Sequence, residues 1–495
     1  MSPASQPGRR APKPAPFAAA GPPDRSGGGR GAWYAVASLP VILSAAAVIR
    51  IVAAWEYTRH FSHHALGVLP FLFEPGNIAY ALVSGQGFAS PLRVPSGPTA
   101  WVAPLYPGLL AALFHLFGVY TFGAFVAAVA LNIALVTLAC WPLYALGRRV
   151  GGVRVAAVAA WLWALYPNAI LLTYESMWGD CLSALLAITA LWAVVALTDA
   201  KAVSWGHGAA YGLLWGAILL TNPTLAVLLP LWLGWSLWRR RSRAVGPARW
   251  RGPAIALAVA ILTAVPWTVR NYRALHAWIP VRSDLGLALW LGNNPRAPFL
   301  WRGQQHPIDD AQQRAMFLRQ GEVAYMHRKL RLAVSYMAGH PAREAALTWY
   351  RFLAFWSGGS PFPLRSLRGF RSAWDRYVLL FDLLAGLAAL GGMVRLFRRG
   401  SPYAFPLAVV PLVVPWAYYL TLAVPRYRLP VDPAVLLFAA LCFSQQLGDA
   451  LSASGRPLPA IGAQSQRPAG ASRTGRLSRS LPAASPPGQV GRSEK

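Results

Sequence analysis

The chain has 495 residues, of which 56% are hydrophobic and 13% are charged, and it contains 22 tryptophans. Soluble domains carry about 25% charged residues, so this composition excludes an ordinary water-soluble protein and indicates a chain that crosses a membrane several times. The formal net charge is +30. The lysines and arginines lie in the two ends and in the loops, without a basic stripe or a nucleic-acid-binding motif, so we expect no nucleic-acid partner.

The two ends of the chain have the composition of disordered tails. Residues 1–32 and 449–495 are rich in Pro, Gly, Ser, Ala and Arg and lack hydrophobic periodicity, so they cannot bury enough apolar surface to offset the entropy of ordering. Both ends are basic, which places them in the cytoplasm by the positive-inside bias. The first apolar run, 33–55, is long enough to span a membrane by itself, so we expect a retained anchor without a cleaved signal.

Apolar runs between the tails predict an all-α polytopic membrane protein with about ten transmembrane helices. An even number of crossings returns the chain to its starting side, and the short basic loops then face the cytoplasm. The run at 109–117 would reach only roughly 14 Å as a helix, so we expect it to lie at the outer interface. The stretch 208–238 breaks at Thr221-Asn222-Pro223, which predicts short or re-entrant helices. The predicted spans are 34–55, 119–146, 153–173, 181–198, 208–222, 224–238, 253–269, 378–394, 403–423 and 433–448.

These spans divide the chain into modules. An N-terminal transmembrane module, 33–269, contains a first external loop at 56–118, and C-terminal transmembrane helices follow at 378–448. Between them, 270–377 is the only long polar stretch, and it has helical periodicity around 311–337. We predict that this stretch forms a small external subdomain over the membrane bundle.

Carboxylates are rare in this chain, and the first external loop holds one in unusual surroundings. Glu74 is flanked by apolar, Gly, Pro and aromatic residues at a membrane face, where a carboxylate is costly to hold, so it is a candidate functional residue. Glu175 and Asp180 lie in the second external loop, and the two loops could bring all three acids over one site. The alternative for each acid is a role in capping a helix or solvating a loop end.

Arginines at the outer ends of predicted spans supply the complementary charge. Arg426 and Arg428 follow the ninth span, and Arg270 ends the seventh. Guanidinium groups at this depth suit a lipid-linked phosphate, which they can hold through paired charge-assisted hydrogen bonds. The alternative is that these side chains reach up to the lipid headgroups.

No metal site is predicted. His60, His63 and His64 have a spacing that could place three imidazoles on one helical face, but no carboxylate or cysteine completes a ligand set nearby, so headgroup-level histidines are the better interpretation. The cysteines lie singly in apolar runs, without a spacing that indicates metal binding or a disulfide framework, and are interpreted as small core residues. They are Cys140, Cys181 and Cys442.

The order of several short motifs resembles that of a known family. An acid follows the first span, and a Tyr, a Gly-x-Gly turn, a Pro-Leu-Tyr-Pro run and a Leu-Phe-Gly run come after it. The motifs are Glu74, Tyr80, Gly85-Gln86-Gly87-Phe88, Pro104-Leu105-Tyr106-Pro107, Leu116-Phe117-Gly118, Leu220-Thr221-Asn222-Pro223, Pro266-Trp267 with Arg270-Asn271, Leu291-Gly292-Asn293-Asn294-Pro295 and Arg426-Tyr427-Arg428. Over residues 34–448 the chain resembles polytopic bacterial glycosyltransferases of the GT-C fold, in the family-39-like group related to protein O-mannosyltransferases and lipid A aminoarabinose transferases.

The resemblance implies a reaction and a location. A hexosyl or pentosyl unit would move from a polyprenyl-monophosphate sugar to an acceptor hydroxyl on the external face of the bacterial inner membrane, with inversion at the anomeric carbon. By position, Glu74 would be the general base, and Asp180 or Glu175 would orient the acceptor or share the proton. The family usually has Asp at the first position, often beside a second acid, whereas here a single Glu precedes Pro75.

The resemblance also implies the binding residues. Arg426 and Arg428, with Arg270, would neutralise the phosphate leaving group, and a substrate cavity would include three aromatic residues. No metal or other cofactor is expected when arginines hold a single phosphate. Partners would be the lipid-phosphate sugar and membrane lipids, and the acceptor could be a protein, a lipid or a glycan. The aromatic residues are Tyr80, Trp101 and Tyr106.

Other classes of protein remain open at this point. A transporter or flippase of lipid-linked saccharides predicts charges near the bilayer midplane, whereas we expect Arg50, Arg154 and Asp382 to lie near span ends. A ligase or polymerase using diphosphate-linked glycans would place its chemistry in a long external loop rich in Arg and His, such as 270–376. A membrane scaffold without enzymatic activity would not explain Glu74 in an apolar loop.

Overall fold

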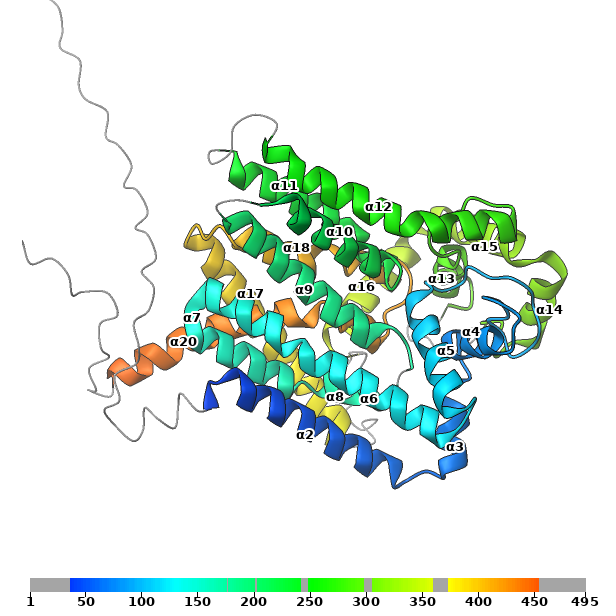
Figure 1. Ribbon diagram of the computed structural model, residues 1–495, viewed down its shortest axis with the longest axis horizontal. Coiled ribbons are helices and arrows are strands. Elements are labelled where there is room, and N and C mark those ends of the chain that lie inside the picture. Colours follow the sequence, from blue (N-terminus) through cyan, green and yellow to red (C-terminus); the bar gives the residue numbers. More distant parts are fainter. Residues whose placement is uncertain are drawn as a thin grey trace, which may run out of the picture. The chain divides into compact units, whose positions relative to one another are not determined.

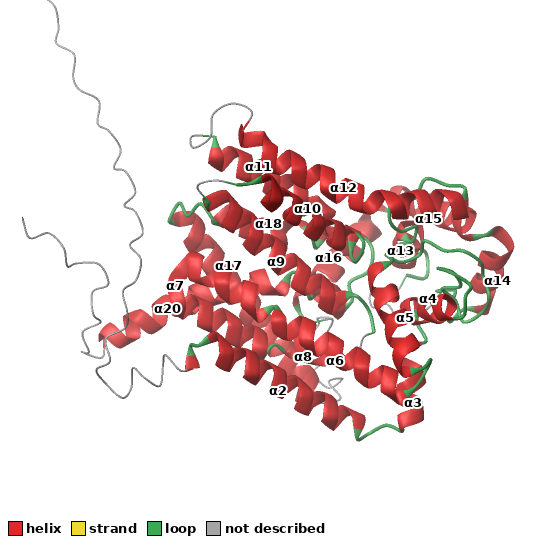
Figure 2. Ribbon diagram, viewed as in Figure 1, coloured by secondary structure: helices red, strands yellow, loops and turns green. Residues whose placement is uncertain are grey.

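The computed structural model describes residues 36–175, 177–200, 203–241, 248–297, 305–358 and 373–453, and these residues form helices and loops without a β-strand (Figures 1 and 2). Contacts divide the chain into two units, Met1–Leu447 and Gly448–Lys495, and all contacts discussed below lie in the first. The helices are α2 Leu39–Thr58, α3 His63–Val68, η1 Leu69–Phe71, α4 Glu74–Val83, α5 Leu105–Phe117, α6 Phe122–Leu138, α7 Cys140–Ala164, α8 Pro167–Glu175, α9 Asp180–Asp199, α10 Trp205–Leu219, η2 Pro223–Val227, α11 Leu228–Arg240, α12 Ala248–Leu275, α13 Leu285–Gly292, α14 Ala311–Gln320, α15 Glu322–Gly339, α16 Pro341–Trp356, α17 Ala373–Arg398, α18 Ala404–Val413, α19 Trp416–Leu420, η4 Pro425–Arg428 and α20 Asp432–Ala453.

The all-α membrane fold is confirmed, and helices occupy each of the ten predicted spans. Among the residues that the structure describes, five segments are long and apolar enough to cross a membrane: Leu39–Thr58, Phe122–Ala164, Asp180–Asp199, Arg249–Leu275 and Arg376–Arg398. The remaining spans fall on shorter or broken helices, so the count of ten crossings stays a prediction.

One long apolar segment holds two predicted spans. The chain from α6 through α7 leaves the helical conformation at Gly152, where φ is 82°, a value that favours glycine. The two halves then pack closely, because a Cβ on Gly147 would lie 2.7 Å from the Cα of Ala156. The break predicted at Asn222-Pro223 is also present, since α10 ends at Leu219 and η2 begins at Pro223.

A buried arginine explains why α7 ends where it does. Arg50 is fully buried within α2 and donates hydrogen bonds to the carbonyls of Ala46, Trp163, Ala164 and Ala169 at 2.9 to 3.3 Å. The last carbonyls of a helix have no partner within the helix. Arg50 therefore caps the end of α7 at its junction with α8. The expectation that Arg50 lies near the end of its span was wrong, because its partners lie at a helix break inside the bundle.

Glycines at intervals of four residues bring α10 and α12 into close contact. A Cβ at Gly208 would lie 2.9 Å from the carbonyl oxygen of Gly252, and one at Gly212 would lie 2.6 Å from that of Ala256. Gly216 faces Thr263 in the same way, at 2.4 Å. Small residues at this spacing let helix backbones approach in a membrane, where packing takes over from the hydrophobic effect as the driving force.

The glycine contact predicts opposite effects for one substitution at two positions. Gly212→Ala should lower the thermal midpoint of the protein in detergent, because the new methyl group collides with α12, and overpacking costs about 1–3 kcal/mol. Gly234→Ala, in α11, meets open space. This control should be neutral or stabilising by up to about 1 kcal/mol, the helix preference of Ala over Gly. A midpoint for Gly212→Ala equal to or above that of the control would contradict the close contact.

The helices of the long polar stretch gather beside the first external loop. Figure 1 shows α13, α14 and α15 next to α4 and α5 at one end of the bundle. The two segments share a buried apolar cluster that includes Ile78 and Trp101 from the first loop and Leu287, Phe317 and Met326 from the second. The predicted subdomain therefore packs on the first external loop, and α14 and α15 occupy the stretch whose periodicity predicted helix.

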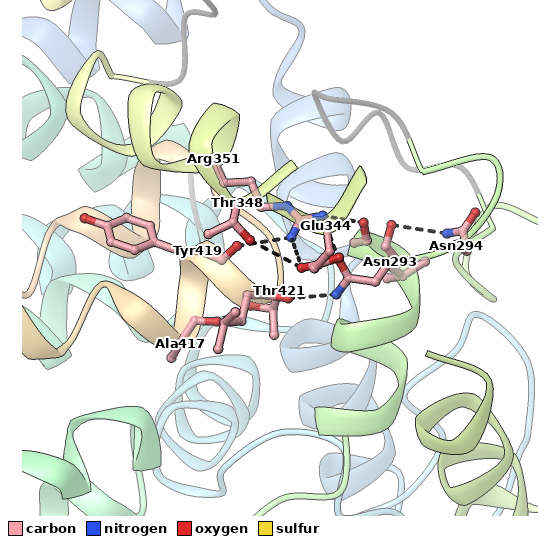
Figure 3. Close-up of polar contacts among 11 residues, drawn as sticks. Asn293, Asn294, Glu344, Thr348, Arg351, Ala417, Tyr419 and Thr421 are labelled. Carbon is pink, nitrogen blue, oxygen red and sulfur yellow. Dashed lines mark hydrogen bonds and ion pairs between the residues drawn. The ribbon is translucent and has the colours of Figure 1, made fainter. Parts of the chain in front are cut away.

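Arg351 fastens this subdomain to the transmembrane helices (Figure 3). Its guanidinium donates to the carbonyls of Gly292 and Tyr419 and to Oδ1 of Asn293, and it lies 3.6 Å from the Glu344 carboxylate. The side chain is only 4% exposed. The Gly-Asn-Asn motif at the end of α13 thus meets α16 and α19 at a single buried cation.

Replacing Arg351 should loosen this junction. Arg351→Met leaves the partly buried carboxylate of Glu344 and the acceptors on Gly292, Asn293 and Tyr419 without their donor. A buried acceptor without a donor costs about 1–3 kcal/mol. The thermal midpoint should fall by several degrees. Arg331→Met, at an exposed arginine of α15, is the control and should change the midpoint little. Equal midpoints for the two variants would show that the junction does not depend on Arg351.

Candidate active site

A cavity of about 450 Å³ lies where both external segments meet the ends of several bundle helices. It brings together six of the predicted site residues, which come from four separate parts of the chain. Three further residues that sequence reasoning missed also line it: Arg282, Asp284 and His306. The six predicted residues are Glu74, Trp101, Tyr106, Glu175, Asp180 and Arg426.

Glu74 is held at the start of α4 by a sharp turn. The segment His63–Phe71 and α4 meet at an angle of 98°. Pro75 suits the first turn of a helix, where its missing N–H costs nothing. Gly76 is required by space, because a Cβ there would lie 2.0 Å from the carbonyl oxygen of Phe71. The positive end of the α4 dipole favours a carboxylate at this position.

One oxygen of Glu74 is paired and the other is not. Oε1 lies 3.1 Å from Nε2 of His306, and Nδ1 of His306 accepts the backbone N–H of Ile308. An accepting Nδ1 leaves the proton of a neutral imidazole on Nε2, so His306 donates to Glu74. Oε2 of Glu74 is buried and has no hydrogen-bond partner within the described ranges. A buried acceptor without a donor is costly, so this oxygen is ready to receive an O–H group.

A second acid and an arginine stand close to this pair. Nε of Arg282 lies 2.9 Å from Oδ1 of Asp284, at the start of α13. Burial raises the pKa of Asp284 against the opposing effect of Arg282, and the nearby Glu74 raises it further. Sequence reasoning could not select these residues, because nothing in 270–377 indicates which polar positions face the first external loop.

Arg426 approaches the cavity from the loop before α20. Its guanidinium carbon lies 3.7 Å from the ring centroid of Trp178, and its Nη1 lies 3.9 Å from Oδ2 of Asp180. The side chain is 20% exposed. Asp180 begins α9, while Glu175 is exposed at the end of α8. The cavity thus has a cation near one of the predicted acids, Asp180.

The two predicted aromatic residues in the cavity have fixed orientations. The Tyr106 hydroxyl donates to Oδ1 of Asn132 at 3.1 Å. The Trp101 ring lies 5.6 Å from the His306 ring and 5.3 Å from Phe317. Both side chains are buried.

Two predicted site residues lie away from the cavity. Tyr80 is 43% exposed and stacks on Tyr120 at 5.7 Å. Arg270 donates to the carbonyls of Thr99 and Phe88, so its N–H groups hold the first external loop. Neither residue is among those that line the cavity.

Arg428 also lies away from the cavity, in a buried ionic cluster. Its Nε lies 2.6 Å from Asp432, and its Nη1 lies 3.3 Å from Asp382 and donates to the carbonyl of Trp356. Asp382 also accepts from Asn168 at 3.2 Å. Asp382, which was expected near a span end, is fully buried and paired. The cluster ties η4 to α17 and α20, which leaves Arg426 as the arginine of this motif that faces the cavity.

Glu322 joins the two external segments behind the cavity wall. Its carboxylate accepts hydrogen bonds from the Thr99 hydroxyl, from the backbone N–H of Ala100 at 2.8 Å and from the Ser283 hydroxyl at 2.7 Å. Ser283 also donates its backbone N–H to the carbonyl of Ala100 at 2.8 Å. This contact fixes the position of Trp101 and of the segment from Arg282 to Asp284, both of which line the cavity.

Lys329 braces α13, which contributes a wall of the cavity. Its ammonium lies 4.9 Å from the Trp290 ring and 5.3 Å from the Tyr325 ring, and the residue is 3% exposed. Burial lowers its pKa from 10.5 to about 8, with a further lowering by Arg328. The folded protein therefore loses this proton at a lower pH than the unfolded chain does.

This difference predicts a pH-dependent stability. Between about pH 8 and 10.5, the unfolded chain holds the proton of Lys329 and the folded protein does not. Stability rises with pH wherever the unfolded state binds more protons. The midpoint of wild type minus that of Lys329→Met should therefore rise over this range and stay flat below it. Arg331→Met, an exposed neighbour, is the control, and a difference for Lys329→Met that is flat throughout would contradict the lowered pKa.

Comparison with known proteins identifies the fold. No protein-family model and no curated protein matches the chain. Solved structures do: the oligosaccharyltransferase AglB from Archaeoglobus fulgidus, in complex with an inhibitory peptide and a dolichol-phosphate, is similar over 86% of this chain and 52% of its own, with 16% identity and a TM-score of 0.50. The Archaeoglobus fulgidus oligosaccharyltransferase in its apo form is similar over 88% of this chain and 53% of its own, with 15% identity and a TM-score of 0.49. ArnT from Cupriavidus metallidurans bound to undecaprenyl phosphate is similar over 87% of this chain and 82% of its own, with 15% identity and a TM-score of 0.35.

The first similarity confirms the predicted GT-C-like fold. The chain spans about half the length of the archaeal oligosaccharyltransferase that it matches. At 16% identity the likeness concerns the fold, and the chemistry must be argued from the cavity itself.

Proposed function

We propose that this protein is a membrane glycosyltransferase that moves a sugar from a polyprenyl-monophosphate donor to an acceptor hydroxyl, with inversion at the anomeric carbon. The main support is that one cavity contains both a group that can accept a proton and groups that can bind a phosphate. A buried carboxylate oxygen of Glu74 without a hydrogen-bond partner in the described part of the chain shares the cavity with the guanidinium groups of Arg282 and Arg426. A base and a phosphate-binding group are the two functions that this transfer requires.

Glu74 supplies the base. The acceptor hydroxyl gives its proton to Oε2 while its oxygen forms a bond to the anomeric carbon from the face opposite the phosphate. The bond between that carbon and the phosphate oxygen breaks at the same time, and its electron pair leaves with polyprenyl phosphate. His306 keeps Oε1 occupied, so Oε2 is the oxygen that takes the proton. A positioned base of this kind contributes about 10²–10⁴ in rate.

Arg426 and Arg282 hold the leaving phosphate. Guanidinium groups stay charged and match phosphate oxygens through paired N–H donors. The AglB structure with a dolichol-phosphate supports a lipid phosphate as the ligand class for this fold. The arginines neutralise the charge that develops on the phosphate, and the proposal includes no metal or other cofactor. The donor's prenyl chain would lie among the membrane helices.

The proposal also places the protein in the cell. The cavity lies at the external face of the bacterial inner membrane, and both termini lie in the cytoplasm. Asp180 and Glu175, at the same cavity, orient the acceptor hydroxyl, which belongs to a protein, a lipid or a glycan.

A transporter or flippase of lipid-linked saccharides is the second candidate. The bundle contains buried ionisable residues, which that class uses along its transport path. Here Arg50 binds carbonyls at a helix end, and Arg428 binds Asp382 and Asp432, so their contacts are structural. The same lipid phosphate would bind in either case, and only sugar transfer separates the two functions.

Removing the base should abolish transfer and spare donor binding. In detergent, with a panel of polyprenyl-phosphate sugars and a cell-envelope extract, Glu74→Gln should lower the transfer rate by about 10²–10⁴. Its affinity for polyprenyl phosphate should stay close to that of wild type, because Gln keeps the size and one acceptor oxygen. Glu56→Gln, the same substitution at an exposed acid, is the control. Products are read by mass spectrometry.

The outcomes separate the candidates. Transfer by wild type and by Glu56→Gln that vanishes in Glu74→Gln supports the glycosyltransferase and identifies its donor. Full activity of Glu74→Gln would remove Glu74 from the role of base. Lipid-phosphate binding without transfer of any sugar, together with saccharide movement across proteoliposomes, would establish the transporter.

A further inference from the structure

We propose that Trp178 is a positioning residue for the donor phosphate, because it holds the guanidinium of Arg426 by its flat face and leaves the N–H edges turned to the ligand. The proposal rests on the proposed function in one respect: the ligand of Arg426 is a lipid phosphate. Trp178 is not part of any motif that the sequence singled out, and it lines the cavity between Glu74 and Arg426.

The contact between the two side chains is close. The guanidinium carbon of Arg426 lies 3.7 Å from the Trp178 ring centroid, which is stacking distance. Asp180 lies 3.9 Å from Nη1, beyond a hydrogen bond, and Tyr427 offers its ring at 5.1 Å and a side-chain hydrogen bond. A guanidinium has five N–H donors, so most of them remain for a ligand.

Two arginines outside the cavity also lie over aromatic rings, at 5.3 Å for Arg428 and 5.0 Å for Arg270, but their N–H groups are engaged by the protein. Arg428 uses its N–H edges on Asp432, Asp382 and a carbonyl, and Arg270 uses its edges on two carbonyls of the first external loop. Phosphate binds at the edge of a guanidinium, through parallel N–H bonds. An arginine whose N–H groups already bind the fold has fewer donors for a phosphate than an arginine that is fixed by its face.

The position of Trp178 is itself constrained. It lies in the link between α8 and α9, next to Gly179, where a Cβ would come within 3.2 Å of Thr221 and 3.3 Å of Tyr106. On its other side the indole ring lies 6.4 Å from the ring of Phe73, the residue before Glu74. One indole therefore touches both the arginine that holds the phosphate and the residue that precedes the base. It thereby connects the two sides of the cavity between which the anomeric carbon would lie.

The test measures the affinity of the purified full-length protein for polyprenyl phosphate without a sugar. Trp178→Ala should weaken binding roughly 3- to 30-fold, the range of a lost stacked cation–π contact. Trp178→Phe keeps an aromatic face and should weaken it roughly twofold. In an Arg426→Ala background, Trp178→Ala should add less than about twofold, because coupled residues are not additive. Trp238→Ala, which removes the indole under Arg241 in a different part of the bundle, is the matched control and should leave affinity unchanged.

Several results would overturn the proposal. One is unchanged affinity for polyprenyl phosphate in Trp178→Ala. Another is a loss of affinity in Trp178→Phe as large as that in Trp178→Ala. A third is a loss in Trp178→Ala that has the same size with and without Arg426. Where Trp178→Ala does not fold, the pair Trp178→Phe and Arg426→Lys decides. Lysine lacks the planar guanidinium that stacks on the ring and binds phosphate through paired bonds, so Trp178→Phe should add no loss of affinity in the Arg426→Lys background, and the same twofold loss there would overturn the proposal. With turnover, the KM for the donor should rise and kcat stay within about threefold. Because binding needs no turnover, coupling of Trp178 to Arg426 in a protein that transfers no sugar would support this inference and overturn the proposed function.

Discussion

The candidate active site depends on one buried contact between segments far apart in the sequence. Glu322 receives three hydrogen bonds, two from residues 99 and 100 of the first external loop and one from Ser283. Burial raises the pKa of Glu322 against these hydrogen bonds and against the charge of Arg270. A buried carboxylate is tolerated only when its donors are in place, so the contact fixes both segments at once. Trp101 directly follows Ala100, and Asp284 directly follows Ser283. The contact therefore holds both residues at the same cavity.

The arginines of this protein show how surroundings decide what an identical side chain does. Arg50, Arg270, Arg351 and Arg428 all use N–H groups on backbone carbonyls, and they brace the fold at helix ends and loop junctions. Arg270 and Arg428 also lie over aromatic rings, at 5.0 and 5.3 Å, whereas Arg426 lies closer to its ring, at 3.7 Å, and lines the cavity. Sequence position placed both kinds of arginine at the outer ends of spans. The distinction between a structural and a ligand-binding arginine therefore lies in which surface of the guanidinium is covered.

The helical fold followed from hydrophobic runs and their lengths, and the break at Pro223 followed from a residue that interrupts helices. The break between 119–146 and 153–173 was expected from the end of the apolar run, and its position at Gly152 came only from the structure. Glu74 and Arg426 could be selected because a charge in apolar surroundings is costly. His306 and Arg282 could not, because no local pattern tells which polar residues of a long loop return to a site formed more than two hundred residues earlier. Arg428 was selected beside Arg426 from its spacing alone, and only the tertiary packing of Asp382 and Asp432 separates their surroundings.

The carbonyl cap formed by Arg50 has a consequence for how the protein is made. Its partner carbonyl on Trp163 lies 113 residues further along the chain, so α2 enters the bilayer before the carbonyls of α7 that accept its hydrogen bonds have been synthesised. An arginine at the centre of an isolated helix costs about 2.5–3.5 kcal/mol on insertion. The first helix is therefore a marginal membrane segment on its own and becomes secure only when the end of α7 arrives. We therefore expect α2 and α7 to associate as soon as α7 has been synthesised. In a chain that ends before α7, the first helix would be only weakly stable in the membrane.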